Sequence, residues 1–285
     1  MGGLRDRLIS DNSRASEGGL MKRYLGHYKA MMKRPEFPKR DLERMLRDLT
    51  MISTTEMGAY AFSRDPLRDR FRDGSYKELA QQAVDCGRGY AKRVAEEYGS
   101  TNPQLILREL GIKVDFVDMP SKTDRVLFAE FLEPDQVYVY LDAVNKAESL
   151  LKRSEVRKLL TLQLDIRQTL LAHELFHVLE IRDRKEIFTQ TYRYQLWKLG
   201  PIRSTSRVQA LGEIAAMAFA QELLHLPYSV YVLDVLLLYG YSENEASGLY
   251  EEMMRSTGRT PCPGLTHLEL LERRSRETAE KPDEK

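Results

Sequence analysis

The residues best suited to chemistry in this chain are two histidines four positions apart, His173 and His177, with Glu174 between them. On a helix, residues four apart lie on one face, so both imidazoles can bind the same metal ion. Glu174 would then lie where its carboxylate can take a proton from a water that the metal activates. The alternative without any metal or catalysis is a surface helix with two solvated histidines.

The sequence around this motif predicts a buried helix. Apolar residues recur three and four apart from residue 159 to residue 181, and no Pro or Gly interrupts residues 155–199. Glu174 and His177 share a stripe with Leu170, Val178 and Ile181. Polar groups on such a stripe need partners, and a metal ion would supply one.

A catalytic zinc ion usually has three protein ligands, so a third ligand must come from elsewhere in the chain. Glu180 lies roughly 10 Å along the helix axis from His173, too far to share one ion on a straight helix. Asp183 would fit a pattern that needs a glycine at position 180, which this chain lacks. The preferred candidate is Glu213, on a second predicted helix whose face is otherwise small or apolar (Ala216, Met217, Ala220, Leu224). Alternatively, Glu213 lies near a helix N-terminus because negative charge is favourable there.

Together the two segments resemble the ImmA/IrrE family of zinc metallopeptidases. The family's Ala-His-Glu-x-x-His motif corresponds to residues 172–177, and its second helix motif matches at seven positions: Glu213, Ala216, Phe219, Ala220, Leu223, Leu224 and Pro227. Residues 76–98 are predicted to form an amphipathic helix. The resemblance covers about residues 76–228. It implies one Zn²⁺ ion, hydrolysis of a protein substrate, and as that substrate a transcriptional repressor with a helix-turn-helix, in mobile-element or stress regulation.

The chain departs from the family pattern at three places. Phe176 precedes the second histidine where the family often has Gly, and His225 stands where it often has Met. A charged segment of helical character, residues 146–160, separates the last predicted strand from the metal helix. This segment could be a lid, a docking surface or a spacer.

The predicted fold class is α+β, mostly helical, with a small mostly antiparallel sheet packed on the HExxH helix and on the glutamate-bearing helix. The predicted strands, at 114–117, 126–132 and 136–142, are rich in Val, Tyr and Phe. If residues 136–142 form the edge strand next to the metal, an extended peptide could pair with it. Alternatively, this is an ordinary strand with a covered edge.

The implied mechanism makes Glu174 the proton acceptor during attack on a peptide carbonyl and then the donor to the leaving amine. The oxyanion would need a second electrophile besides the metal. His225 and Tyr228 are candidates through their proximity to the end of the second helix. His225 is equally well explained by a favourable interaction with the C-terminal end of the helix dipole.

Composition limits the class of protein and its compartment. Charged residues make up 31% of the 285 residues and the net charge is +1, so overall charge does not indicate nucleic-acid binding. Cys86 and Cys262 provide no disulfide framework, which favours the cytoplasm. We expect no signal peptide, and we expect no membrane partner because the longest apolar run, residues 230–241, is short and contains Asp234.

The sequence divides into three regions. Residues 1–75 form a basic region with predicted helices before Pro35 and at 40–52, and residues 76–228 form the metallopeptidase-like domain. Residues 229–285 are predicted to contain helices at 229–239 and 242–255 and a charged tail. The basic region is either a solvated helix face or a docking face for nucleic acid or a repressor. Residues 1–18 and 271–285 are expected to be mobile.

Two functions from different classes fit these observations. The first is a zinc endopeptidase. The second is a non-catalytic regulatory or interaction module in which zinc is structural. Structural zinc sites favour four protein ligands, often cysteines. A fourth protein ligand would therefore indicate the module, and an open fourth position would indicate the enzyme.

Overall fold

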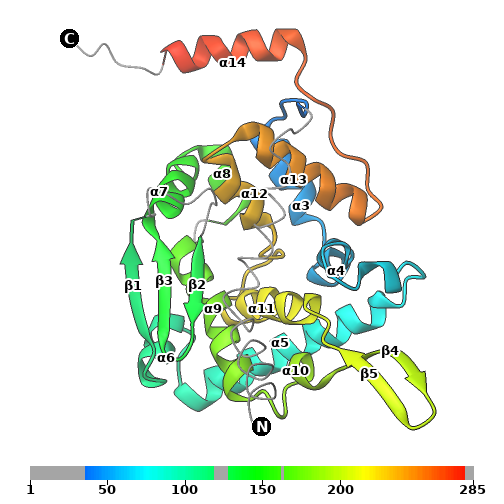
Figure 1. Ribbon diagram of the computed structural model, residues 1–285. Helices are drawn as coiled ribbons and strands as arrows, with labels where there is room; N and C mark the ends of the chain where they lie inside the picture. The colour runs from blue at the N-terminus through cyan, green and yellow to red at the C-terminus, as the bar shows by residue number, and fades with distance from the viewer. Residues whose placement is uncertain (1–35, 119–127, 162–163, 280–285) are drawn as a thin grey trace, which may run out of the picture.

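A computed structural model describes residues 36–118, 128–161 and 164–279 (Figure 1). One continuous set of buried apolar side chains runs from Leu42 to Met254. The described chain is mostly helical and has a small sheet at one side, which confirms the predicted α+β class.

Three helices form the centre of the molecule: α5 (Tyr76–Tyr98), α9 (Ile166–Arg182) and α11 (Ala210–Leu223). The predicted boundaries of α5 are confirmed, and its last turn ends at Gly99 with φ +58°. α11 packs against both other helices. Its buried residues include five alanines, whose small side chains allow neighbouring helices to come close.

α9 begins later than the apolar periodicity alone indicates. α8 (Ser154–Leu159) ends before Thr161, which has φ +66°. The chain then restarts as α9, whose first turn is capped by the Asp165 carboxylate accepting a hydrogen bond from the Gln168 N–H. The predicted charged helical segment is therefore two helices, α7 (Leu141–Leu150) and α8, and neither is continuous with α9.

The small sheet is mixed and has the strand order β1-β3-β2. β1 (Lys113–Val117) pairs in parallel with β3 (Gln136–Tyr140), and β2 (Ala129–Leu132) pairs antiparallel with β3. The sequence allows residues 136–142 to be an edge strand that could pair with a peptide. This placement is wrong, because β3 lies in the centre of the sheet. The edge strand against α9 is β2 (Figure 1). α6 (Pro103–Glu109) leads into β1, and residues 126 and 127 of the predicted second strand lie outside the described chain.

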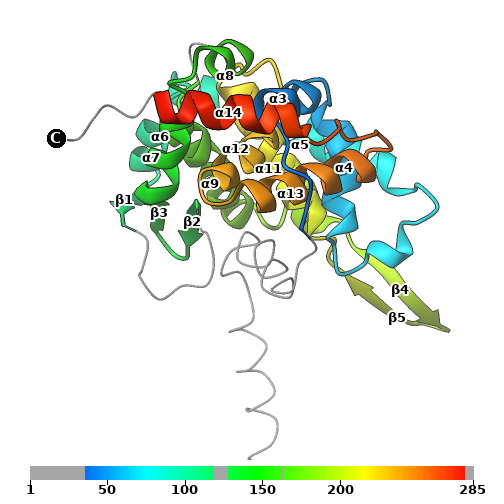
Figure 2. The ribbon, with the colours of Figure 1, turned by 90° about the horizontal axis from the view of Figure 1, so that it is seen from above.

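A second, two-stranded sheet was not predicted from the sequence. After α10 (Phe188–Thr191), β4 (Tyr194–Leu199) and β5 (Ile202–Ser206) form an antiparallel hairpin that leads into α11. Figures 1 and 2 both show this hairpin projecting beyond the helices.

The remaining helices join the two ends of the described chain. α3 (Leu42–Thr50) and α4 (Thr54–Ser63), followed by a short 3₁₀ turn (Arg68–Arg70), pack against α12 (Val232–Tyr239) and α13 (Glu243–Ser256). α14 (His267–Ala279) continues through residues 271–279, where the sequence predicted a mobile tail. The predicted helix before Pro35 and the expected mobile residues 1–18 lie outside the described chain. No described helix combines the length and apolar character needed to cross a bilayer.

Candidate metal centre

Side chains from α9 and α11 meet at one point in the buried centre of the molecule. His173, His177 and Glu213 each offer a ligand atom, and these atoms all lie within 4.8 Å of one another. The Nε2 atoms of the two histidines are 3.1 Å apart. His173 Nε2 and His177 Nε2 each lie 3.6 Å from an oxygen of Glu213. The sequence therefore predicted correctly that these three residues come together, and the group can hold a metal ion.

The two histidines owe their position to the helical spacing and to the packing around α9. Both imidazoles point to the same side because they are one turn apart, as predicted. His173 is 3% exposed, and His177 retains a little more access. Phe176 packs its ring against Phe219 of α11, with 5.6 Å between ring centroids, so the bulky residue lies between the two metal-bearing helices.

Glu213 projects from the first turn of α11 into this group. Its side chain is buried, and its Oε1 has no hydrogen-bond partner among the described residues. A buried carboxylate oxygen without a partner is costly in free energy, and a cation between Glu213 and the two imidazoles would satisfy it. This unpartnered oxygen is the observation that best fits a metal to the site.

Glu180 holds His177 from the other side of the ring. His177 Nδ1 lies 3.3 Å from Glu180 Oε2, and the Thr189 hydroxyl donates to Glu180 Oε1 at 2.5 Å. Gly212 leaves the space for this carboxylate, since a Cβ there would lie 2.9 Å from Glu180 Oε1. Glu180 is therefore no ligand, in agreement with its distance along the helix, and its role in positioning His177 was not predicted from the sequence. The signal in the sequence is that Glu180 follows His177 by three positions on the same helix, a spacing that brings two side chains into contact.

Glu174 is fixed by the edge strand. The backbone N–H of Phe131 in β2 donates to Glu174 Oε2 at 2.8 Å, so the carboxylate is held between α9 and the sheet. Burial, together with the nearby charge of Glu213, raises the pKa of Glu174 to about 7, although His177 and the Phe131 N–H act in the opposite direction. A carboxyl group with a pKa near neutrality can both accept and return a proton.

The pKa shifts of the other ionisable groups in the site follow from burial and neighbouring charges. Burial lowers the pKa of His173, and the charge of His177 lowers it further. Burial alone would also lower the pKa of His177, but the hydrogen bond with Glu180 and the charge of Glu213 raise it to about 9. Burial raises the pKa of Glu213. The site thus contains several buried carboxylates, whose negative charge needs a proton or a metal cation to balance it.

The other candidates from the sequence lie apart from this group. The Tyr228 hydroxyl donates to the backbone carbonyl of Leu160, so its proton is already engaged. His225 follows the last turn of α11, is exposed and has φ +53°. No contact in the described chain joins either side chain to the two imidazoles or to Glu213. Asp183, a rejected ligand candidate, follows the end of α9 and forms an ion pair with Arg93 at 2.6 Å.

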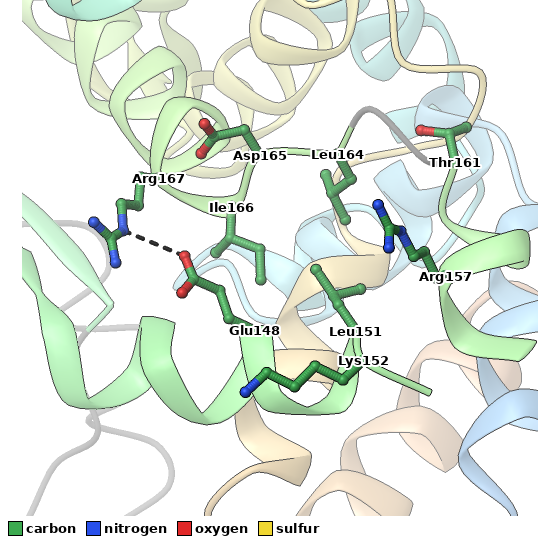
Figure 3. A pocket seen from close by; sticks show the side chains of 9 residues that line it. All are labelled: Glu148, Leu151, Lys152, Arg157, Thr161, Leu164, Asp165, Ile166 and Arg167. Carbon is green, nitrogen blue, oxygen red and sulfur yellow. Dashed lines mark ion pairs between the residues drawn. The ribbon is translucent and has the colours of Figure 1, made fainter. Parts of the chain in front are cut away.

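A separate cavity of about 460 Å³ lies at the N-terminal end of α9 (Figure 3). Residues of α7, α8 and the start of α9 line it, and Arg167 Nε lies 3.3 Å from Glu148 Oε1 across it. None of the three candidate ligands lines this cavity. The predicted segment at 146–160 therefore forms a wall of a cavity that is distinct from the metal centre.

Comparisons with protein-family models, curated proteins and solved structures gave no match. The resemblance to the ImmA/IrrE pattern therefore rests on the motif residues alone.

Proposed function

We propose that this chain is a zinc-dependent metalloendopeptidase that hydrolyses peptide bonds of a protein substrate. The observation that carries the proposal is the meeting of His173, His177 and Glu213 around one point, with Glu174 fixed beside them. This set of residue types is the one that the resemblance to the ImmA/IrrE peptidases predicts.

The spacing of the donor atoms supports zinc as the metal. Two ligands each about 2.1 Å from a tetrahedral zinc ion lie roughly 3.4 Å apart. The separations between the donors here are 3.1 Å between the imidazoles, 3.6 Å from His173 Nε2 to Glu213 Oε2, and 3.6 Å from His177 Nε2 to the other carboxylate oxygen, Glu213 Oε1. Two imidazoles and one carboxylate are also a typical donor set of catalytic zinc sites.

Each residue then has a defined task. When bound, zinc would act as a Lewis acid and activate water for attack on a carbonyl carbon. Glu174 accepts the proton and passes it to the leaving amine, while the Phe131 N–H keeps its carboxylate in place. Glu180 fixes the ring orientation of His177. The strand available to an extended substrate is β2, which replaces β3 in this proposal.

The number of ligands favours an enzyme over a structural zinc module. In the described chain the group has three donor residues, whereas structural sites typically have four. Both cysteines are free, and neither belongs to the group. A transcriptional repressor as substrate, without direct binding of nucleic acid by this chain, and a cytoplasmic location complete the proposal; these follow from the resemblance and from composition.

The test compares the purified chain with its Glu174→Gln variant on a proteome-derived peptide library, with cleavage products identified by mass spectrometry. We expect the variant to keep its zinc, measured by elemental analysis, and to lose on the order of 10²–10⁴-fold or more in cleavage rate because the proton acceptor is gone. His173→Ala and Glu213→Ala should instead lose the metal. Equal cleavage by the chain and by Glu174→Gln would overturn the mechanism, and full zinc content in Glu213→Ala would remove Glu213 from the ligand set.

A further inference from the structure

The tip of the β4–β5 hairpin exposes large apolar side chains. Trp197 is 52% exposed, Leu199 74% and Ile202 61%. Leu199 and Ile202 face each other across the turn, and Trp197 is two positions back on β4. Single exposed apolar residues are ordinary, but three adjoining ones at a projecting tip mark an interaction site.

The hairpin is anchored at its root and free at its tip. At the root, the Tyr194 ring packs on Phe71 with 5.0 Å between ring centroids. At the turn, Gly200 has φ +57°, a conformation that glycine adopts without strain. No other described helix or strand packs extensively on β4 or β5, and the tip extends away from the helices in both views (Figures 1 and 2). The apolar tip is therefore presented to solvent.

The charge of this segment differs from that of the rest of the chain. Residues 187–212 contain no Asp or Glu and four basic residues, a formal charge of +4, while the whole chain carries +1. Lys198 and Arg203 lie directly opposite each other in the hairpin register. Like charges in that position destabilise a hairpin, and a negatively charged surface would relieve the repulsion.

This arrangement matches the layers of a bilayer surface. Aliphatic side chains occupy the end of the tip, a tryptophan lies behind them, and cations flank them. A membrane interface places acyl chains, the aromatic-rich boundary and anionic headgroups in that order. A second copy of the chain fits less well, because it would bring another +4 hairpin to the same place. We propose that the β4–β5 tip binds the surface of membranes that contain anionic lipids, with Leu199, Ile202 and Trp197 entering the bilayer interface.

The chain offers a built-in reporter, because Trp197 is its single tryptophan. The fluorescence emission of Trp197 in the full chain is measured with two kinds of vesicle, one of phosphatidylcholine alone and one of phosphatidylcholine with phosphatidylglycerol. Binding to the same vesicles is measured by co-sedimentation. We expect a blue shift and co-sedimentation with the anionic vesicles only, both weakened at high salt.

Two variants and two matched controls separate the contributions of the apolar side chains and of the cations to vesicle binding. Leu199→Ser with Ile202→Ser should abolish the blue shift. Lys198→Gln with Arg203→Gln should weaken binding about 30-fold, from about 1 kcal/mol for each cation near an anionic surface. Leu268→Ser, at a leucine that is 66% exposed on α14, and Arg68→Gln with Arg70→Gln, at exposed arginines, should bind like the unchanged chain.

Several results would overturn the proposal. The first is an emission spectrum that anionic vesicles leave unchanged, and the second is equal binding by the tip variant and its control. A blue shift that instead follows protein concentration and dimerisation would assign the tip to a second copy, and one produced by duplex DNA but by no vesicle would assign it to nucleic acid. Vesicle binding should be the same with and without Zn²⁺, so its outcome is separate from that of the peptidase proposal.

Discussion

At the scale of single residues, the contact between Glu180 and His177 decides how well the site is organised. A histidine that binds a metal through Nε2 is fixed in orientation and tautomer by whatever accepts a hydrogen bond from its Nδ1–H. Here the acceptor is a carboxylate that is itself buried and held by the Thr189 hydroxyl. Glu180 is therefore a positioning residue, and its effect should appear in metal affinity.

Glu180→Gln should lower zinc affinity about 10–100-fold while the fold is kept, because an amide is a weaker acceptor than a carboxylate. Competition with a fluorescent chelator measures this. The matched control is Glu186→Gln, at an exposed glutamate just beyond α9, which should leave the affinity unchanged. An affinity loss of the same size in both variants would show that general negative charge, and not the contact with Nδ1, is responsible.

The raised pKa of His177 predicts that metal binding releases a proton. With its pKa at about 9, His177 is protonated at pH 7 in the metal-free chain, and Nε2 must lose that proton before it can bind a metal. We therefore expect release of about one proton per ion at pH 7, and an apparent affinity that rises about tenfold per pH unit up to about pH 9. Titration calorimetry in buffers of different ionisation enthalpy counts the protons. Heats that do not depend on the buffer would contradict the prediction.

The sequence predicts those parts of the site that depend on local geometry. His173, Glu174 and His177 follow from helical spacing, and Glu213 follows from a carboxylate among small apolar neighbours. The contact of Glu174 with the Phe131 N–H was not predictable, because it depends on which strand lies at the edge of the sheet, and the order of strands is set by long-range packing. Tyr228 shows the opposite error, since proximity in sequence did not bring it to the site.

At the scale of elements, the close approach of α5 and α11 places Glu213. Gly87 in α5 faces the backbone of α11, and a Cβ at this position would lie 2.1 Å from the Ala215 carbonyl oxygen. A backbone atom cannot move aside unless the whole helix shifts. The absence of a side chain at residue 87 therefore sets the distance between the two helices.

Gly87→Ala should destabilise the chain by about 3 kcal/mol through overpacking and should also weaken metal binding by displacing α11. Gly89 is the matched control, because it lies on the same helix, is exposed, and would place a Cβ within 4 Å of nothing. Gly89→Ala should stabilise the chain by about 0.5–1 kcal/mol, since alanine favours a helix. Urea unfolding followed by circular dichroism measures both. A neutral Gly87→Ala would contradict the close approach of α5 and α11.

Elements differ in how far the sequence determines them. α5 was predicted with its observed boundaries, because its apolar stripe is long and a glycine ends it. The β4–β5 hairpin was missed because its tip is apolar on the solvent side, the reverse of the alternation that identifies a half-buried strand. The expectation of no membrane partner rested on the lack of a long apolar run, and an exposed apolar hairpin tip can bind a membrane surface without one.

At the scale of the whole molecule, the three regions seen in the sequence share one hydrophobic core. Buried residues of α3 and α4 belong to the same set as those of α9, α11, α12 and α13. Arg40 links the ends of the described chain. Its side chain is 6% exposed, and its guanidinium donates to the Glu251 carboxylate and to the Cys262 carbonyl oxygen, each at 2.9 Å.

Arg40→Gln should therefore destabilise the entire molecule, and not the N-terminal region alone. The variant leaves the Glu251 carboxylate with Arg255 as its remaining ion-pair partner and leaves the Cys262 carbonyl oxygen without its donor, at a cost of about 2 kcal/mol or more. Arg44→Gln provides the matched control, because the pair of Arg44 with Glu269 lies at the surface, where solvent screening leaves it little effect on stability. Calorimetry should give one transition for the unchanged chain and for both variants, at a clearly lower temperature only for Arg40→Gln. A contrary result would be that Arg40→Gln splits the unfolding into two transitions, one at a lower temperature and one at the temperature of the unchanged chain. In that case residues 36–75 would be an independent unit, and the core would not unfold cooperatively across the regions.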